Sequence, residues 1–295
     1  MRIVVTGRQG QLVQSMAERA ASRPNVELIA LGRPELDLLR PATVRPAIAA
    51  ARPDIVVSAA AYTAVDQAED EPDIAFKVNE EGAGEVARAA RLAGAPVIHL
   101  STDYVFSGEA DAPYDETAST GPRSVYGRSK LAGEAAVAAA NSEHLILRTA
   151  WVYSPFGRNF VKTMLKLAET QDALNVVDDQ LGNPTSALEI AEAIFAVIGR
   201  WQRGPGRPGG VFHFVGTGDT SWCGFARHIF RASEGLGGPV ATVNAITTEE
   251  FPTRAVRPKN SRLDSGRFAA KFGYRAPEWE ESTRAVVRRL LEGGH

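Results

Sequence analysis

Short apolar runs alternate with Ala-rich amphipathic segments along the first half of the chain. Residues 3–6, 26–31, 54–59, 96–101 and 144–148 are rich in Val, Ile and Leu, and stretches with helical spacing of apolar residues separate them. Strands that alternate with helices are typical of βαβ units, whose right-handed crossovers place helices on both faces of a parallel sheet. The pattern therefore predicts an α/β fold with a doubly wound, Rossmann-like parallel sheet.

A glycine-containing turn separates the first apolar run from the first helix-like segment. Gly7 and Gly10 lie in this turn, and Gln11 and Leu12 follow it. A turn of this kind presents backbone N–H groups and the positive end of a helix dipole, where the pyrophosphate of a dinucleotide binds. We therefore predict a cofactor site at these four residues. Val13 stands where a third glycine is expected, and its bulk is expected to shift the helix slightly outward.

Small and polar residues also follow two other predicted strands. Residues 59–62 come after the third strand and residues 101–104 after the fourth. Ligands of open parallel sheets bind in the crevice outside the carboxyl ends of the strands. We expect both segments to share one crevice with the glycine turn.

The regular alternation weakens after residue 148, which indicates a change of domain. We predict a dinucleotide-binding domain at residues 1–150, with elements near 172–200 and 211–216 that return to it. Residues 151–295 are expected to form mainly a smaller α/β substrate-binding lobe.

Composition restricts the class of protein. A net charge of −2 over 295 residues gives no basic footprint for nucleic acid or an anionic membrane. A single cysteine, Cys223, excludes an internal disulfide framework, and no apolar run has the length of a signal peptide or membrane span. The five histidines have no metal-ligand spacing. These features predict a cytoplasmic enzyme without a metal site, nucleic-acid partner or membrane partner. The sequence does not decide the oligomeric state, and we expect a monomer or homodimer.

Tyr126 and Lys130 are the residue pair that most suggests chemistry. They are four residues apart at the start of a helix-like stretch, so they lie on one helix face. A cation near a phenol favours the phenolate and lowers the tyrosine pKa toward the working range. Tyr126 is therefore a candidate proton donor or acceptor.

These residues belong to a longer series of motifs: 7–12, 59–66 (AAAYTAVD), 101–106 (STDYVF), 125–134 (VYGRSKLAGE), 148–153 (RTAWVY), 179–185 (DQLGNPT) and 257–263 (RPKNSRL). In this order and over nearly the whole chain, they resemble the extended short-chain dehydrogenase/reductase superfamily and, within it, the dTDP-4-dehydrorhamnose reductase family. The resemblance implies NAD(P)H-dependent reduction of the 4-keto group of dTDP-4-dehydro-L-rhamnose to dTDP-L-rhamnose.

The resemblance also implies roles for matched positions. Tyr126 would protonate the C4 alkoxide, Lys130 would lower the tyrosine pKa and hold the nicotinamide ribose, and Thr102 would donate a hydrogen bond to the same oxygen. Asn79 matches a position that supports the lysine, but an ordinary helix residue is an equal alternative. The remaining cofactor contacts are Gly7, Gly10, Gln11, Leu12, Arg33, Ala59, Ala60, Ala61 and Tyr62, and the nucleotide-sugar contacts are Asp103, Tyr104, Trp151, Asn183, Arg257 and Asn260.

Cofactor preference depends on the end of the second strand, where an acidic residue normally selects NAD. Arg33 stands there instead and suits a 2′-phosphate, although Glu35 is available to pair with it. We predict that NADPH is favoured over NADH by a modest margin and that both are used. Some of the reductases that this chain resembles are described as binding Mg²⁺ through an acidic residue on the first helix; Ser15 lacks a carboxylate, so Mg²⁺ is not expected.

Three alternatives stay open at this point. One is 4-ketoreduction of another nucleotide deoxysugar. The second is a non-catalytic regulatory member of the superfamily, such as the regulatory subunit of methionine adenosyltransferase. The third is an epimerase or 4,6-dehydratase, although Asp103-Tyr104 stands where dehydratases carry an Asp-Glu pair.

Overall fold

The computed structural model describes residues 1–204 and 206–293. Positions 205, 294 and 295 lie outside the described residues; they include the last two residues of the predicted substrate lobe and one of the five histidines. A parallel six-stranded sheet with the order β10-β5-β4-β3-β1-β2 forms the larger part of the fold. Its strands are β1 (Arg2–Thr6), β2 (Glu27–Leu31), β3 (Ile55–Ser58), β4 (Val97–Thr102), β5 (His144–Thr149) and β10 (Gly210–His213).

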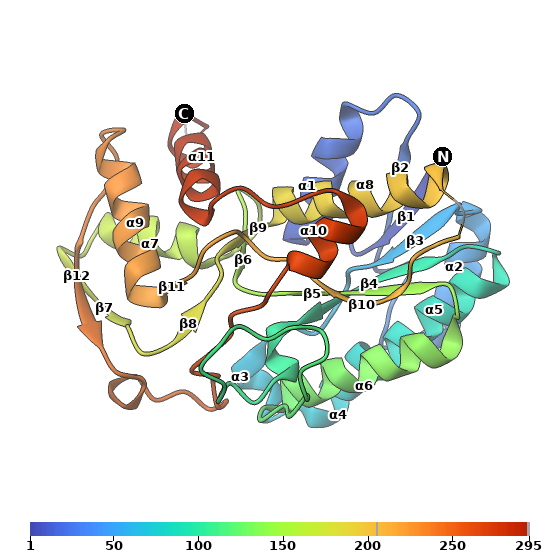
Figure 1. Cartoon of the computed structure of the whole chain (residues 1–295), viewed down its shortest axis with the longest axis horizontal. Helices are drawn as coiled ribbons and strands as arrows, with labels where there is room; N and C mark the ends of the chain where they lie inside the picture. Colours follow the sequence, from blue (N-terminus) through green and yellow to red (C-terminus); the bar gives the residue numbers. More distant parts are fainter. Residues whose placement is uncertain (205, 294–295) are drawn as a thin grey trace.

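Helices cover both faces of this sheet (Figure 1), as the alternating pattern predicts. One face carries α1 (Gln11–Ala21) and α8 (Ala187–Arg203), and α10 (Gly266–Phe272) packs beside β10. The opposite face carries α2 (Val44–Ala51), α5 (Ala83–Leu92) and α6 (Val125–Ala140).

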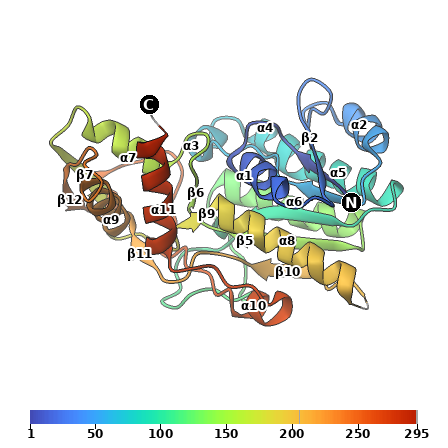
Figure 2. The ribbon, with the colours of Figure 1, turned by 90° about the horizontal axis from the view of Figure 1, so that it is seen from above.

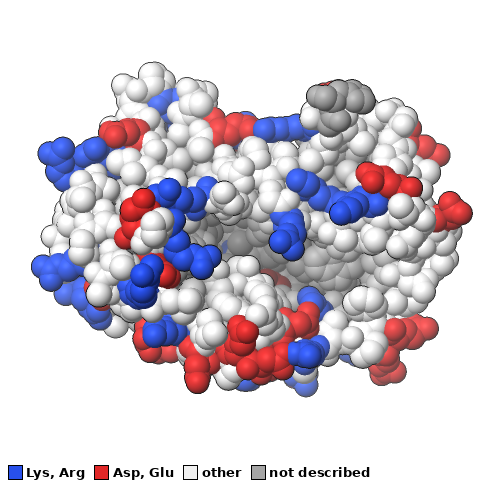
Figure 3. All heavy atoms as spheres, turned by 180° about the vertical axis from the view of Figure 1, so that it is seen from behind, with Lys and Arg blue, Asp and Glu red and all other residues white. Residues whose placement is uncertain are grey.

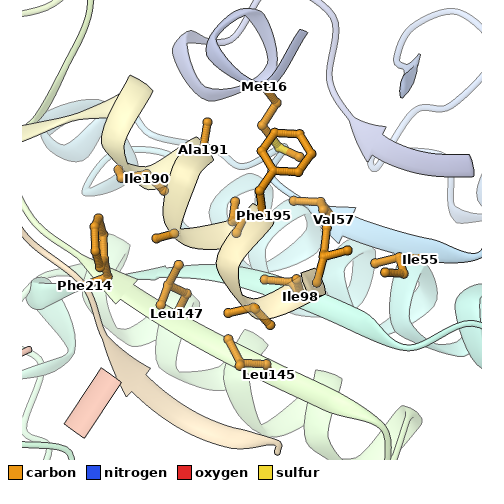
Figure 4. Close-up of a cluster of buried hydrophobic side chains, with 14 of the residues drawn as sticks. Met16, Ile55, Val57, Ile98, Leu145, Leu147, Ile190, Ala191, Phe195 and Phe214 are labelled. Carbon is orange, nitrogen blue, oxygen red and sulfur yellow. The ribbon is translucent and has the colours of Figure 1, made fainter. Parts of the chain in front are cut away.

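The core between α8 and the sheet shows why these sequences form these elements. Ile190 and Phe195 of α8 pack with Met16 of α1 over buried strand residues such as Val57 and Leu147 (Figure 4). The central strands are buried on both faces, so they are continuous apolar runs without alternation.

Short helical elements lie at the carboxyl ends of the strands. They are η1 (Pro41–Thr43), α3 (Val65–Ala68), α4 (Pro72–Phe76), the π-helical turn η2 (Lys77–Gly82) and η3 (Asp103–Val105). Single π-helical turns occur often at functional sites, and η2 packs directly on α6.

A second, smaller lobe lies beside one end of the sheet (Figure 2). Its core joins α7 (Phe160–Ala168), α9 (Trp222–Glu234) and α11 (Trp279–Glu292) to a parallel pair of strands, β7 (Ala173–Val177) and β12 (Thr242–Ile246). Two further short strand pairs are β6 (Val152–Tyr153) with β9 (Thr185–Ser186), and β8 (Leu181–Gly182) with β11 (Thr220–Ser221). The turn η4 (Thr248–Glu250) follows β12.

The elements predicted to return to the first domain are divided between the two lobes. β10 extends the six-stranded sheet and α8 packs on it, whereas β7 pairs with β12 in the smaller lobe. The expected return near residue 172 is therefore wrong for this strand. A five-residue apolar run such as 173–177 does not show which strand it will pair with. Its neighbour in the structure is the later segment 242–246.

Among residues 1–204 and 206–293, no helix has both the length and the apolar character that crossing a bilayer requires.

Candidate active site

A cleft of about 1150 Å³ opens at the carboxyl ends of β1, β3 and β4. It lies where the sheet order reverses, because β2 and β3 flank β1 on opposite sides. Seen from behind, the surface is hollowed in its middle, with Lys and Arg side chains along the margins (Figure 3). The lining residues include 6–13, 32–33, 36–39, 59–63, 65, 74, 78, 100–104, 126, 149–152, 157–158 and 190. The segments predicted to share one crevice therefore do so.

The glycine turn forms one wall of this cleft. Gly7 has a φ of 101°, in the left-handed region that favours glycine, and Gly10 caps α1 without a side-chain hydrogen bond. The N–H groups of the first turn of α1 are thus available to an anion. Val13 is buried, and a Cβ built on Gly7 would approach its methyl group to 3.3 Å. The valine therefore packs directly against the turn, and the predicted outward shift of α1 stays a prediction.

A single hydroxyl connects the glycine turn to the residues that follow β3. Thr6 Oγ1, at the end of β1, accepts hydrogen bonds from the backbone N–H groups of Ala59 (3.0 Å) and Ala60 (2.9 Å). This fixes the residues after β3 beside the glycine turn.

Arginines surround the end of β2. Arg33 is exposed and lines the cleft. Glu35 does not pair with it, as the sequence allowed, but binds Arg8 at 2.5 Å. The guanidinium of Arg33 therefore stays available to a ligand phosphate. Arg8 also lines the cleft and was missed in the sequence, because it stands inside the glycine turn, where only the backbone was considered.

Thr102 ends β4 inside the cleft, and Asp103 begins η3 directly after it. Thr102 Oγ1 donates to Asp103 Oδ1 at 2.9 Å and accepts from the backbone N–H of Tyr104 at 3.2 Å. Burial raises the pKa of Asp103 to about 6, against the opposing effect of hydrogen bonds from Ser261 and Thr102. Its second oxygen, Oδ2, has no hydrogen-bond partner among the described residues. The carboxyl group can therefore accept a hydrogen bond from a ligand.

Tyr104 and Tyr126 lie together at the cleft. Their rings meet edge to face with centroids 5.5 Å apart. Tyr126 is in the first turn of α6, which Ser124 caps by accepting a hydrogen bond from the N–H of Gly127 at 3.0 Å. Burial raises the pKa of Tyr126, the Thr102 hydroxyl opposes this effect, and the charge of Asp103 adds to it. At neutral pH Tyr126 is therefore a phenol, the form that can give a proton.

Lys130 is buried behind the cleft wall, and its predicted effect on the pKa of Tyr126 stays a prediction. Its side chain is buried, and its ammonium donates to the carbonyl of Leu100 on β4 at 2.6 Å. Burial lowers the pKa of Lys130 to about 8, and the charge of Glu134 opposes this effect. Both residues lie in the first turns of α6, and the lysine side chain turns toward the sheet.

Trp151 lines the cleft on the side of the smaller lobe. Its φ of 47° is unusual for a bulky residue, and its ring stacks on Trp222 with centroids 3.6 Å apart. Gly182 faces the indole so closely that any Cβ would overlap it. The surroundings thus hold Trp151 in a strained backbone conformation, with its ring fixed at the cleft.

Asn183 and Asn260 were predicted to bind substrate, but the structure uses both to fix loops. Asn183 donates to the carbonyl of Gly218 at 2.7 Å and accepts from the N–H of Leu263 at 2.9 Å. Asn260 donates to the carbonyls of Ala110 and Ala112 and accepts from Arg262. Neither is part of the described cleft lining. Each amide would have to break a backbone contact to reach a ligand.

Arg257 lies at the edge of the site. It donates to the hydroxyl of Tyr104 at 3.3 Å and pairs with Asp66 at 2.7 Å. Asn79, in η2, accepts from the N–H of Tyr62 at 2.8 Å and donates to Ser129 Oγ at 2.9 Å. It thus fixes the wall after β3 against α6, and it contacts the helix of the lysine without touching the lysine itself.

Gln11 and Arg158 show a connection between the lobes that the sequence did not suggest. Gln11 was predicted to contact the cofactor, yet its side chain turns to the smaller lobe, where Oε1 accepts from Ser154 (2.9 Å) and Asn159 (3.0 Å). Between these two residues, Arg158 lines the cleft and is exposed. Only the folded loop brings it near the glycine turn, about 150 residues away in sequence.

Comparisons with known proteins agree with one another. The family model described as the RmlD substrate binding domain matches residues 1–292. The dTDP-4-dehydrorhamnose reductase of Sinorhizobium fredii is 52% identical over 295 residues, covering 100% of this chain and 99% of that relative. Among solved structures, a dTDP-4-dehydrorhamnose reductase from Clostridium acetobutylicum has a TM-score of 0.91 and 39% identity, covering 99% of this chain and 100% of that one. The Bacillus anthracis enzyme in complex with NADP has a TM-score of 0.91 and 34% identity, with 98% and 99% covered.

Proposed function

The chain belongs to the dTDP-4-dehydrorhamnose reductase family, and from this premise we propose how its residues carry out the reaction. The family's activity, that of an oxidoreductase acting on a nucleotide sugar, is the activity of this chain. The substrate is dTDP-4-dehydro-L-rhamnose and the product dTDP-L-rhamnose. The observation that carries the proposal is that Thr102 and Tyr126 both line the cleft beside the glycine turn.

The residues of the glycine turn fit a dinucleotide. No side chain caps the first-turn N–H groups of α1, and Gly7 leaves free the space that a Cβ would occupy in the turn. The cleft is large enough for a cofactor with a sugar beside it. The cofactor supplies the hydride that reduces the C4 carbonyl carbon. We assign NADPH as the favoured cofactor, with NADH also used, because Arg33 stands at the end of β2 and the Bacillus anthracis relative was crystallised with NADP.

Tyr126 gives its phenolic proton to the oxygen that becomes the C4 hydroxyl. When its hydroxyl turns away from Asp103, Thr102 donates a hydrogen bond to the same oxygen, which stabilises the charge that develops on it. Asp103 and Tyr104 flank the hexose, with the free oxygen of Asp103 as an acceptor for a sugar hydroxyl. Trp151 offers its ring to the sugar from the opposite lobe.

Lys130 contributes from the buried side of β4, behind the residues that line the cleft. Its ammonium holds the carbonyl of Leu100 next to Thr102 and supplies a positive charge beneath the site where the nicotinamide ribose would bind. Arg257 contributes a cation for the substrate diphosphate at the edge of the cleft. We retain residues 1–150 as the dinucleotide-binding domain, joined by α8 and β10, and residues 151–295 as mainly the substrate lobe.

The decisive experiment is NADPH oxidation with dTDP-4-dehydro-L-rhamnose, followed by identification of the product. We expect dTDP-L-rhamnose. Hydride delivery to the opposite face would give the C4 epimer, and that product, or oxidation only with a different 4-keto sugar, would contradict the assignment. Binding of NADPH without turnover would instead favour the regulatory alternative.

A further inference from the structure

Glu134 is a buried carboxylate on α6, one helical turn after Lys130. Its Oε1 accepts hydrogen bonds from Ser101 Oγ at 2.5 Å and from Arg148 Nε at 2.8 Å, and its Oε2 accepts from a terminal nitrogen of Arg148 at 2.7 Å. The side chains of Glu134 and Arg148 are 6% and 5% exposed. This is a planar, two-bond ion pair that solvent screens little.

The ion pair and the Ser101 hydrogen bond join three elements, α6, β4 and β5, which lie beside Thr102 and Tyr126. Glu134 belongs to α6, which carries Tyr126; Ser101 precedes Thr102 on β4; and Arg148 lies on the neighbouring strand β5. The carboxylate therefore fixes the position of α6 along its axis relative to β4 and β5. A shift of the helix would move the phenol of Tyr126 relative to the hydroxyl of Thr102.

The same carboxylate also balances the charge beneath the site. Lys130 and Arg148 are two buried cations near one buried anion, and residues at i and i+4 on a helix are neighbours. His99, the other titratable group facing Lys130 from β4, is buried with a pKa well below its usual value and stays neutral. Glu134 is thus the group that favours the charged form of Lys130.

We propose that Glu134 is a positioning residue for the reduction: through Ser101 and Arg148 it holds α6 in register with β4 and β5, and it places a negative charge one helical turn from Lys130. Tyr126 and Thr102 then address the same substrate oxygen. This inference depends on the proposed roles of those two residues and of Lys130.

The test is Glu134→Gln, which keeps the shape of the side chain and removes its charge. Without the carboxylate, Lys130 loses its proton at lower pH, so the alkaline limb of the kcat/KM profile should move down by about one pH unit. We also expect kcat to fall about 10- to 100-fold, because small misplacements of catalytic groups have effects of that size. An alkaline limb that stays at the wild-type pH would overturn the proposal.

A matched control is Glu192→Gln on α8, which removes a carboxylate paired with Arg19 and Arg23 at the other face of the sheet. This control should lower stability without moving the pH profile. If Glu134→Gln does not fold, Ser101→Ala removes only the hydroxyl donor and leaves the ion pair. It should lower kcat with little change in the KM for NADPH, and an unchanged kcat would count against the positioning role.

The design separates this inference from the proposed function. If Tyr126→Phe retains full turnover, the assigned chemistry itself is wrong. If Tyr126→Phe is inactive while Glu134→Gln and Ser101→Ala keep the wild-type profile and kcat, only the role of Glu134 fails.

Discussion

Tyr126 is the residue on which the assigned chemistry depends most directly. Its ring packs against Tyr104, and burial keeps its hydroxyl protonated near Thr102. Neither neighbour can replace it as a proton donor, because the hydroxyl of Thr102 is weakly acidic and that of Tyr104 accepts a hydrogen bond from Arg257 at the edge of the cleft.

We expect Tyr126→Phe to bind NADPH normally and to lose about 10²–10⁴-fold in kcat, the usual contribution of a general acid. Stopped-flow turnover and NADPH titration by fluorescence give the two quantities. Tyr274→Phe, which removes a remote hydroxyl bound to Glu189, serves as the control and should keep full activity. Loss of NADPH affinity equal to the loss of kcat would point to a cofactor role instead.

Arg33 is the residue that should decide cofactor preference. Since Glu35 pairs with Arg8, the Arg33 guanidinium is available to the 2′-phosphate that distinguishes NADPH from NADH. Arg33→Ala should reduce the ratio of kcat/KM for NADPH over NADH by about tenfold, the effect of one charge-assisted hydrogen bond. Arg123→Ala, an exposed arginine paired with Glu109, should leave the ratio unchanged. A wild-type preference for NADH would refute the role of Arg33.

At the scale of elements, α6 approaches its neighbours through two glycines. A Cβ at Gly127 would overlap the carbonyl oxygen of Tyr104, and one at Gly133 would overlap that of Asn79. The helix therefore packs backbone to backbone against η3 and η2. This close contact holds Tyr126 and Lys130 near the residues after β3, which Asn79 fixes through its hydrogen bond to Tyr62.

Gly133→Ala should accordingly destabilise the protein by about 1–3 kcal/mol, the usual cost of overpacking a core contact. Chemical denaturation measures this change. The control is Gly199→Ala in α8, where a Cβ would meet only the flexible end of Arg203, so that substitution should be neutral or slightly stabilising. Equal stability of the two variants would show that α6 can move away from η2 at no cost.

Local signals account for what the sequence predicted well. The glycine turn, the strand ends and the Tyr126–Lys130 spacing are contiguous patterns, and parallel topology brings their positions to one cleft. The contacts that the sequence did not show have a common physical origin in distant backbone partners. The amides of Asn183 and Asn260 bind loops that are far away in sequence, and Lys130 turns to a carbonyl on another strand.

At the scale of the whole molecule, the first helix has no acidic residue at its inner face. Ser15 is buried, and its hydroxyl donates to the carbonyl of Gln11 at 2.8 Å. We therefore expect activity to be unchanged after exhaustive dialysis against EDTA. Activity that disappears on chelation and returns with Mg²⁺ would contradict this expectation.

One loop of the smaller lobe reaches over the cleft to the glycine turn. Gln11, at the start of α1, accepts hydrogen bonds from Ser154 and Asn159 of the smaller lobe, and a Cβ built on Gly157 between them would lie 3.3 Å from Gln11 Cγ. This tether carries Arg158 into the cleft lining beside the glycine turn. Within the part of the chain that the structure describes, Arg158 makes no ion pair, so its charge is available to a diphosphate.

Arg158 should bind the pyrophosphate that NADPH and NADH share, whereas Arg33 should bind the 2′-phosphate that only NADPH has. Arg158→Ala is therefore expected to raise the KM for both cofactors by the same factor, about tenfold for one charged hydrogen bond. It should also weaken inhibition by ADP without affecting inhibition by 2′-AMP, and Arg33→Ala should do the reverse. If Arg158→Ala instead raises only the KM for the nucleotide sugar, then the arginine binds the substrate diphosphate. The loop held by Gln11 would in that case position the nucleotide sugar and not the cofactor.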